Sequence, residues 1–195
     1  MNILNGEWLN QPKQYEVNDK EVSFVTEQGT DFWQKTNYGY QRNSGHVYLF
    51  DIEKDNYTFL VKASFQGKYL YDQCGIMVYN DPEHWAKASL ENANEIDKML
   101  GAVVTNHGYS DWSVSQTYGI DVESIYYKVH KKGSDFLIEA SLDNQNYIQL
   151  RMFHLSDISK LRVGVYACSP LESSCKAYFQ EFEVLPLQWD EENYI

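Results

Sequence analysis

The sequence predicts an all-β protein, a sandwich of antiparallel sheets, and three observations favour this fold class. Apolar residues alternate with other residues at a period of two in short segments along the whole chain. Turn-forming residues separate these segments. No segment shows a convincing long helical pattern. Short strands joined by turns are typical of a β-sandwich.

The alternation is clearest in residues 57–65, where Tyr57, Phe59 and Val61 occupy every second position. Similar patterns occur in residues 124–131, 136–153, 160–170 and 175–187. Within 136–153, the polar run Asp143-Asn144-Gln145-Asn146 predicts the turn of a hairpin. The best candidate for a helix is 90–100, which is short and could equally be a loop.

Length and composition predict one domain. The chain has 195 residues and a mass of 22.8 kDa, and a domain of this length buries roughly 70% of its unfolded surface without needing a disulfide or a metal. Aromatic residues make up 15% of the chain, including 16 Tyr, which suits β-strands and ligand-facing surfaces. We expect a single sandwich domain over residues 1–187 and an acidic C-terminal tail over residues 188–195.

The charge balance argues against two classes of partner. The chain has 28 acidic and 16 basic residues and a net charge of −12. Nucleic acids and anionic membranes are bound mainly by Lys and Arg, so neither is an expected partner. The simplest consequence of the charge is solubility.

The cysteines and the N-terminal sequence favour a reduced, cytoplasmic protein. Cys74, Cys168 and Cys175 are odd in number and form no CxxC pair. Cys74 lies in an apolar segment and is expected to be a small buried residue, whereas Cys168 and Cys175 flank a short loop and could meet across it. The N-terminus has no basic start or apolar core of a signal peptide, and no apolar run reaches 18 residues.

Strand alternation predicts a polar and aromatic face between residues 71 and 91. If Ala86, Ala88 and Leu90 point into the core, the residues between them share the opposite face. The same argument applied to three segments assigns to that face Gln73, Gly75, Met77, Tyr79, Trp85, Lys87, Ser89, Glu91, Trp112, Val114, Gln116 and Tyr118. Aromatic rings stack on sugars and polar groups bind hydroxyls, so the face is a candidate ligand platform. Alternatively, Trp85 and Trp112 lie under loops, and Lys87 and Glu91 form an ordinary ion pair.

A second dense cluster lies in residues 30–46. Its members Trp33, Tyr38, Tyr40 and His46 could rim a site. Equally, the aromatic residues could plug the end of the sandwich. A lone histidine is more often a structural hydrogen-bonding residue than a base.

Motifs of metal binding and catalysis are weak or missing. The five histidines are scattered without a zinc-site spacing, so no metal or cofactor is expected. Glu95 and Asp97 begin like the Glu-x-Asp-x-x-Glu strand of jelly-roll glucanases, but the third acidic position is Leu100. Retaining hydrolysis needs two carboxyl groups in one site. This motif is therefore rejected as a catalytic signature.

Seven segments in order, "DFWQKTNYGY", "GHVY", "YDQCGIMV", "WAKASLE", "VVTNHGYSDWS", "LRM" and "VGVYACSP", resemble the DUF1349 family. The resemblance extends from about Trp8 to Leu185. It implies a concanavalin A-like jelly roll of two antiparallel sheets and a relationship to the fungal regulator of enolase, without implying an established catalytic mechanism.

The polar and aromatic positions of the family correspond here to Trp33, Thr36, Tyr38, Asp72, Gln73, Trp85, Lys87, Glu91, Ser110, Asp111, Trp112, Ser113, Arg151, Tyr166 and Ser169. Proteins of this fold class hold ligands on the concave sheet. The candidate ligand-binding residues, on the concave face and its rim, are Trp33, Tyr38, Asp72, Gln73, Trp85, Lys87, Glu91, Asp111, Trp112, Arg151 and Tyr166. For Asp72 and Asp111, a structural role in turns is the open alternative.

Three functions remain open. The leading hypothesis is a domain that binds a carbohydrate or similar polyol without catalysis, because no matched acid and base are evident. The second is a cytoplasmic regulator that binds a protein such as a glycolytic enzyme, since Tyr and Trp also suit protein interfaces. The third is a glycoside hydrolase or lyase, which requires Asp72, Glu91, Asp111 and Lys87 to converge in one cleft.

Overall fold

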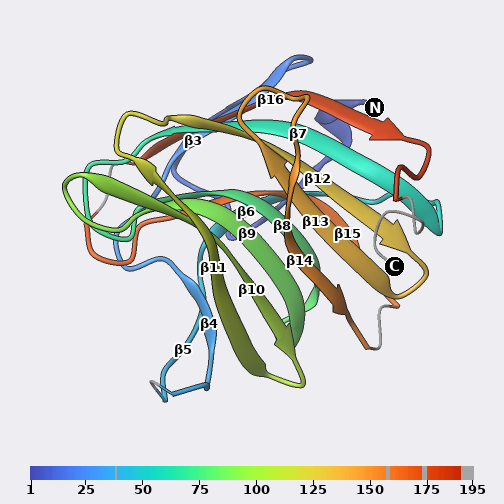
Figure 1. Ribbon diagram of the computed structural model, residues 1–195, viewed down its shortest axis with the longest axis horizontal. Helices are drawn as coiled ribbons and strands as arrows, with labels where there is room; N and C mark the ends of the chain where they lie inside the picture. The colour runs from blue at the N-terminus through green and yellow to red at the C-terminus, as the bar shows by residue number, and fades with distance from the viewer. Residues whose placement is uncertain (38, 157–158, 173–174, 190–195) are drawn as a thin grey trace.

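The predicted fold class is confirmed by the computed structural model, which describes residues 1–37, 39–156, 159–172 and 175–189 (Figure 1). Two antiparallel seven-stranded sheets form a jelly-roll sandwich. Sheet A has the order β1 (Glu7–Leu9), β6 (His46–Phe50), β15 (Arg162–Cys168), β8 (Gln73–Asp81), β9 (His84–Asn92), β10 (Asp97–Asn106), β11 (Tyr109–Gly119). Sheet B has the order β14 (Ile148–His154), β13 (Asp135–Ser141), β12 (Ser124–Lys132), β7 (Asn56–Gln66), β16 (Lys176–Leu185), β3 (Glu21–Val25), β2 (Gln14–Val17).

Two short elements complete the described chain. A two-stranded hairpin, β4 (Phe32–Gln34) with β5 (Gln41–Asn43), projects beside β10 and β11 (Figure 1). A 3₁₀ helix, η1 (Ile3–Asn5), precedes β1. No helix in the described part of the chain is long and apolar enough to cross a membrane.

The main hydrophobic core lies between the two sheets. Sheet A contributes residues such as Ile76 and Ala88, and sheet B contributes Phe59, Tyr127 and Phe179, all fully buried. These are alternate positions of their strands, so the period-two pattern determines which side chains face the core. As predicted from the alternation, Ala86, Ala88 and Leu90 belong to this core, together with Cys74, Ile76 and Val78.

A second hydrophobic cluster lies on the outer face of sheet A, under the β4–β5 hairpin. Phe32 of β4 packs there against Trp85 and Tyr166, with ring centroids 5.6 Å and 6.3 Å apart. The backbone N–H of Gln34 donates to Ser110 Oγ at 2.8 Å and ties the hairpin to β11. The hairpin therefore converts part of an outer sheet face into a buried interior.

The structure confirms the turn predicted at residues 143–146 but differs from the prediction for residues 90–100. Asp143 Oδ1 accepts the backbone N–H groups of Gln145 and Asn146, which closes the predicted hairpin turn. Residues 90–100 form neither a helix nor a loop alone, because they span the end of β9, a turn and the start of β10. Asn94 Oδ1 accepts two backbone N–H groups and holds that turn.

The start of the predicted tail is anchored to sheet B. The backbone N–H of Gln188 donates to Thr58 Oγ1 at 2.8 Å. The remainder of the expected acidic tail, residues 190–195, lies outside the described residues.

Candidate functional site

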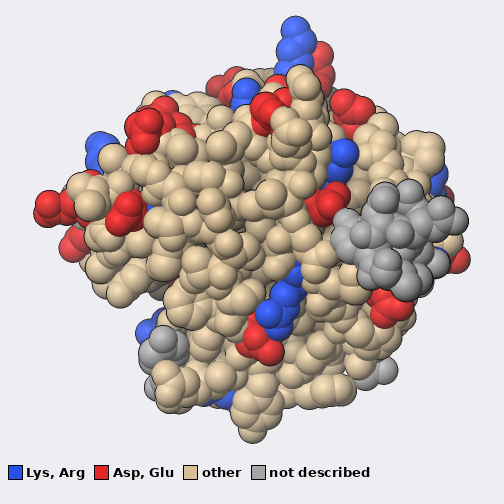
Figure 2. Space-filling model, viewed as in Figure 1, with Lys and Arg blue, Asp and Glu red and all other residues tan. Residues whose placement is uncertain are grey.

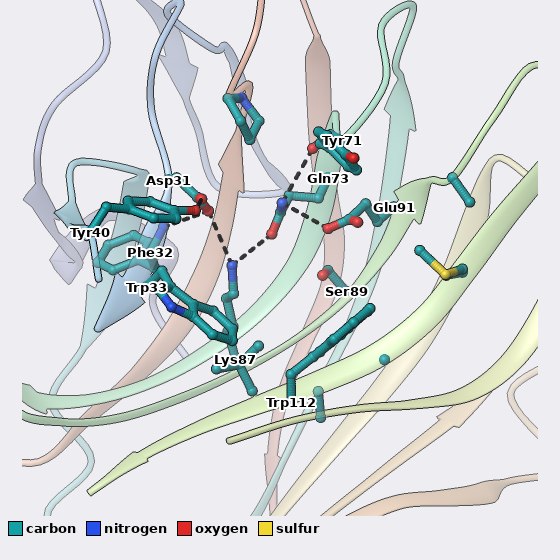
Figure 3. A pocket seen from close by; sticks show the side chains of 16 residues that line it. Asp31, Phe32, Trp33, Tyr40, Tyr71, Gln73, Lys87, Ser89, Glu91 and Trp112 are labelled. Carbon is teal, nitrogen blue, oxygen red and sulfur yellow. Dashed lines mark hydrogen bonds and ion pairs between the residues drawn. The ribbon is translucent and has the colours of Figure 1, made fainter. Parts of the chain in front are cut away.

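A pocket of about 470 Å³ opens on the outer face of sheet A, between β8–β11 and the β4–β5 hairpin (Figure 3). This volume is within the range of small-ligand sites. The lining residues are Asp31, Phe32, Trp33, Tyr40, Tyr71, Gln73, Lys87, Ser89, Glu91, Ala93, Met99, Gly101, Ala102, Val103, Trp112 and Pro170. Four aromatic residues with polar side chain atoms, and five strongly polar residues, thus surround one space.

Trp33 and Trp112 provide indole surface at the pocket. The indole N–H of Trp33 donates to the Thr36 carbonyl at 2.9 Å, which fixes the ring. Trp112 is 49% exposed. It lies beside Gly101, where a Cβ atom would come within 3.3 Å of the indole nitrogen and 2.6 Å of the Ser113 carbonyl. Glycine at position 101 therefore lets β11 and the Trp112 ring approach β10 closely.

Gln73 is the centre of a hydrogen-bond network beneath the aromatic residues (Figure 3). Its Oε1 accepts from Lys87 Nζ at 2.8 Å and from the Tyr166 hydroxyl at 3.0 Å. Its Nε2 donates to Glu91 Oε2 at 2.9 Å and to the Tyr71 carbonyl at 3.2 Å. Both donors and both acceptor sites of the amide are used, so its orientation is fixed. Because every hydrogen-bonding group of this buried amide is satisfied, the Gln73 side chain is held rigidly.

Lys87 and Asp31 form a buried ion pair. Lys87 is only 5% exposed, and its Nζ lies 3.4 Å from Asp31 Oδ1. Asp31 Oδ2 also accepts the Tyr40 hydroxyl at 2.9 Å, and its Oδ1 accepts the Phe32 backbone N–H at 2.7 Å. Burial is the largest single effect and alone would lower the pKa of Lys87, but the charges of Asp31, Cys168 and Glu91 together with the Asp31 hydrogen bond outweigh it, and the pKa is raised. The ammonium group therefore stays charged inside the protein.

Glu91, the second carboxyl group of the pocket, forms no ion pair among the described residues. Burial raises its pKa from 4.5 to about 7, against the opposing effect of the Lys87 charge. Its Oε2 accepts one hydrogen bond, from Gln73, and among the described residues Oε1 has no hydrogen-bond partner. Glu91 is therefore the carboxyl group of the pocket that is available to a ligand.

The structure brings together five of the residues predicted to bind a ligand. Trp33, Gln73, Lys87, Glu91 and Trp112 all line the pocket. Tyr166 lies beneath them, fully buried, with its ring 5.5 Å from Lys87 Nζ. Tyr38 lies outside the described residues.

Trp85 does not line the pocket. It has 0% exposure, lies under Phe32 of the hairpin, and donates its indole N–H to the Pro82 carbonyl at 3.2 Å. It does lie on the outer face that alternation assigned to it, but the β4–β5 hairpin covers it. The exposed tryptophan of this face is Trp112.

Asp72 is a structural residue of the loop before β8. Its Oδ2 accepts the backbone N–H groups of Lys68 and Tyr69 at 2.8 Å and 3.0 Å. Its Oδ1 accepts the Ser169 hydroxyl at 2.6 Å. Because it is completely buried by these partners, Asp72 stabilises the loop and does not reach the pocket.

Asp111 and Arg151 lie at the seam where the edge strands β11 and β14 of the two sheets meet. Arg151 Nη2 is 2.9 Å from Asp111 Oδ1, and Nη1 donates to Ser113 Oγ at 3.2 Å. This ion pair joins the two sheets, and neither residue lines the pocket. Figure 2 shows that residues that are neither acidic nor basic cover most of the visible face.

A β-bulge corrects the predicted face of β11. The register shifts between Leu100 and Gly101, so that Gln116 pairs with the core residue Leu100. Paired residues share a sheet face. Gln116 and Tyr118 therefore point to the core side, and Tyr118 packs against the main core, whereas Trp112 stays on the pocket side. Strict alternation placed Gln116 and Tyr118 on the wrong face because it does not allow for the extra residue of a bulge.

His46 is structural, as the sequence favoured. The Glu27 backbone N–H donates to Nε2 at 3.1 Å, and Nδ1 lies 2.6 Å from the Asn10 carbonyl. Burial lowers the pKa of His46, so it is held neutral. Cys74, Cys168 and Cys175 are free and buried, so Cys168 and Cys175 do not form the disulfide that their spacing allowed. Among the described residues, no group of three or more His, Cys, Asp or Glu side chains could hold a metal ion.

Sequence reasoning missed Asp31, the partner of Lys87. The residue lies in the dense cluster 30–46, but it precedes β4, where strand alternation gives no information on direction. Tyr71 was missed for the same reason, because it lies in the loop before β8. The one signal for Asp31 was the need of a buried lysine for a carboxylate.

Known proteins similar to this chain include members of one sequence family and proteins that share the fold alone. A family model described as "Protein of unknown function (DUF1349)" matches residues 8–187. Regulation of enolase protein 1 of Saccharomyces cerevisiae is 35% identical over 184 residues, which cover 93% of this chain and 90% of the yeast protein.

A crystal structure of a functionally unknown protein from Saccharomyces cerevisiae superposes with a TM-score of 0.88 at 32% identity, covering 97% of this chain and 100% of the other. A GH43 protein from Bacillus licheniformis has a TM-score of 0.68 at 12% identity, covering 94% of this chain but 37% of the other. A polysaccharide lyase of family 18 has a TM-score of 0.58 at 11% identity, covering 93% and 94%. The last two show a common fold alone.

Proposed function

The chain belongs to the DUF1349 family, and from this premise we propose that its sheet A pocket binds a carbohydrate or similar polyol. The observation that carries the proposal is the combination of Trp33 and Trp112 with the Gln73 network in one pocket. Indole rings stack on the apolar faces of sugars, and fixed polar groups bind the hydroxyls.

Preorganisation supports this function. The Trp33 ring is held by Thr36, and the Gln73 amide is held by four hydrogen bonds. A site that is already ordered loses little conformational entropy on binding, which favours small ligands with few contacts. The similarity in fold to a GH43 protein and a polysaccharide lyase is compatible with a polysaccharide ligand, but the proposal rests on the pocket.

A screen on a glycan array tests the proposal. The purified protein is compared with Trp112→Ala, which removes exposed indole surface, and with Tyr126→Ala, a control on the outer face of sheet B. We expect a glycan class that is bound by the wild type and by Tyr126→Ala but lost in Trp112→Ala. No bound glycan, or equal binding by all three proteins, would contradict the proposal. Incubating a bound glycan with the protein and analysing the products tests the hydrolase or lyase alternative.

We propose as a second candidate that the chain is a cytoplasmic regulator that binds a protein partner. The supporting observation is the name of the yeast relative, Regulation of enolase protein 1. A glycolytic enzyme is then the first partner to test. A pull-down from a cytoplasmic extract should recover a stoichiometric partner, and recovery of chaperones alone would contradict this candidate.

A further inference from the structure

We infer that the ligand of the pocket carries an amino group, as amino sugars do, and that Glu91 binds this group. This inference rests on the proposed function and names its ligand class. Among the described residues that line the pocket, Asp31 and Glu91 are acidic and Lys87 is basic. The pocket therefore has one more carboxyl group than it has cations.

Lys87, the basic residue of the pocket lining, already contacts other residues of the protein. Lys87 Nζ contacts Asp31 Oδ1 at 3.4 Å and donates to Gln73 Oε1 at 2.8 Å. Among the described residues, no Lys, Arg or His side chain forms an ion pair with Glu91, and its Oε1 accepts no hydrogen bond. Glu91 is partly buried, and a carboxylate held away from water without a cation is costly, so a ligand that supplies the cation is favoured over a ligand that does not.

The aromatic residues favour the same ligand. Trp33, Tyr40, Tyr71 and Trp112 line the pocket with the two carboxyl groups. The faces of aromatic rings attract cations, and the attraction is stronger where water is displaced. Carboxyl and aromatic groups around one space are the elements that recognise an ammonium group.

The protonation of Glu91 supports the inference. The charged and titratable groups that act on it are Lys87 from its own strand, Asp31 from the segment before β4, and Tyr166 and Cys168 from β15. Burial raises its pKa to about 7 despite the Lys87 charge. An added ammonium group beside Glu91 favours the charged carboxylate. Binding should therefore release a proton when it occurs below neutral pH.

Acidic sugars are disfavoured by the same arrangement. A ligand carboxylate would meet Asp31 and Glu91, and it could pair with Lys87 only by competing with Asp31. Like charges placed together oppose binding. The net charge of −12 adds long-range repulsion. The expected order of affinity is amino sugar, neutral sugar and acidic sugar.

Calorimetric titration with three matched ligands tests this order. β-1,4-Linked trisaccharides of glucosamine, glucose and glucuronate are titrated at pH 7 into the wild type, into Glu91→Gln, and into Glu181→Gln as a control on the outer face of sheet B. We expect the wild type and Glu181→Gln to bind the glucosamine trisaccharide about tenfold more tightly than the glucose trisaccharide, since one charge-assisted contact is worth about that factor. Glu91→Gln should lose this preference.

Each other outcome overturns the inference in a distinguishable way. If the glucose trisaccharide binds as tightly as the glucosamine trisaccharide, the amine inference fails and the proposed function stands. If Glu91→Gln keeps the preference, or Glu181→Gln loses it equally, the amine is attracted by the acidic surface in general and not by Glu91. If no trisaccharide binds, the inference fails, and the glycan array decides separately whether the proposed function fails with it.

Discussion

The outer faces of the two sheets are built from the same kinds of residue and differ in what covers them. Sheet A presents Lys87, Glu91 and Gln73 on alternate strand positions, and sheet B presents Lys62 and Tyr126 in the same manner. On sheet A the side chain of Lys87 is 6% exposed and contacts a carboxylate. On sheet B the side chain of Lys62 is 29% exposed, and it lies 3.9 Å from Glu181.

The outer face of sheet B behaves as a solvated surface. Lys62 Nζ lies 5.2 Å from the Tyr126 ring, and the Tyr126 hydroxyl donates to Glu181 at 3.1 Å. Such pairs are worth at most about 1 kcal/mol each where water competes. On sheet A, beside the β4–β5 hairpin, Gln73 and Lys87 are almost inaccessible to water and form a hydrogen-bonded network. The hairpin that covers sheet A, and not the strand pattern, therefore makes the pocket.

The two tryptophans of the sheet A face give the largest expected contrast. Trp85→Ala should lower the free energy of unfolding by about 3 to 5 kcal/mol, because it empties a large buried site, whereas Trp112→Ala should change it by less than about 1 kcal/mol because Trp112 is half-exposed. Urea unfolding of both variants measures the difference. Equal losses would show that the hairpin does not divide this face into interior and pocket.

A matched pair of lysine substitutions compares the two faces directly. Lys87→Met should lower the free energy of unfolding by about 3 kcal/mol or more, since it leaves Asp31 as a carboxylate without its cation in a largely buried place. Lys62→Met on sheet B should cost less than about 1 kcal/mol. Denaturant unfolding in the same buffer checks both values. A large loss for Lys62→Met would contradict the description of sheet B as a solvated face.

Glu91→Gln tests the electrostatics of the pocket through pH. The pKa of Glu91 is raised on folding from 4.5 to about 7, so the folded protein holds this proton more tightly than the unfolded chain does. Its contribution to stability is complete below pH 4.5 and is lost as the pH rises through 7. Relative to the wild type, Glu91→Gln should gain up to about 3 kcal/mol between pH 4.5 and 8.

The measurement for Glu91→Gln is urea unfolding of both proteins at several pH values in this window. Glu181→Gln, on sheet B, serves as the control and should follow the wild type. A constant difference between Glu91→Gln and the wild type at all pH values would show that Glu91 has an ordinary pKa in the folded protein.

The seam between the sheets should give the smallest effect. Arg151→Gln removes the ion pair with Asp111, whose side chain is 69% exposed. The expected loss is less than about 1 kcal/mol, and glycan binding should not change because neither residue lines the pocket. Thermal unfolding and the glycan array check these two results. A loss of binding in Arg151→Gln would extend the site to the seam.

Strand alternation predicted the fold and much of the pocket because both depend on local geometry. Placing Ala86 and Ala88 in the core puts Lys87 and Glu91 on the opposite face, and the structure has this arrangement. The same reasoning could not show that Trp85 is covered, since the hairpin that covers it is about 50 residues away in the sequence.

The errors have equally specific causes. The bulge in β11 turns Gln116 to the core side, and no residue type in "SDWSVSQTYG" signals an extra residue there. Asp31 lies outside any strand, so alternation gave it no direction, although a buried Lys87 requires such a partner. Asp72 is used by the backbone of its own loop, which is the common role of Asp in turns.

The most direct test of the central claim is an NMR titration with a bound glycan, observing the indole N–H signals of the five tryptophans. If the sheet A pocket binds the ligand, the signals of Trp33 and Trp112 should shift with a common dissociation constant, and the signal of Trp8, which packs against Tyr15 and Tyr48, should remain in place. Unchanged Trp33 and Trp112 signals, with shifts confined to residues of sheet B, would contradict the account.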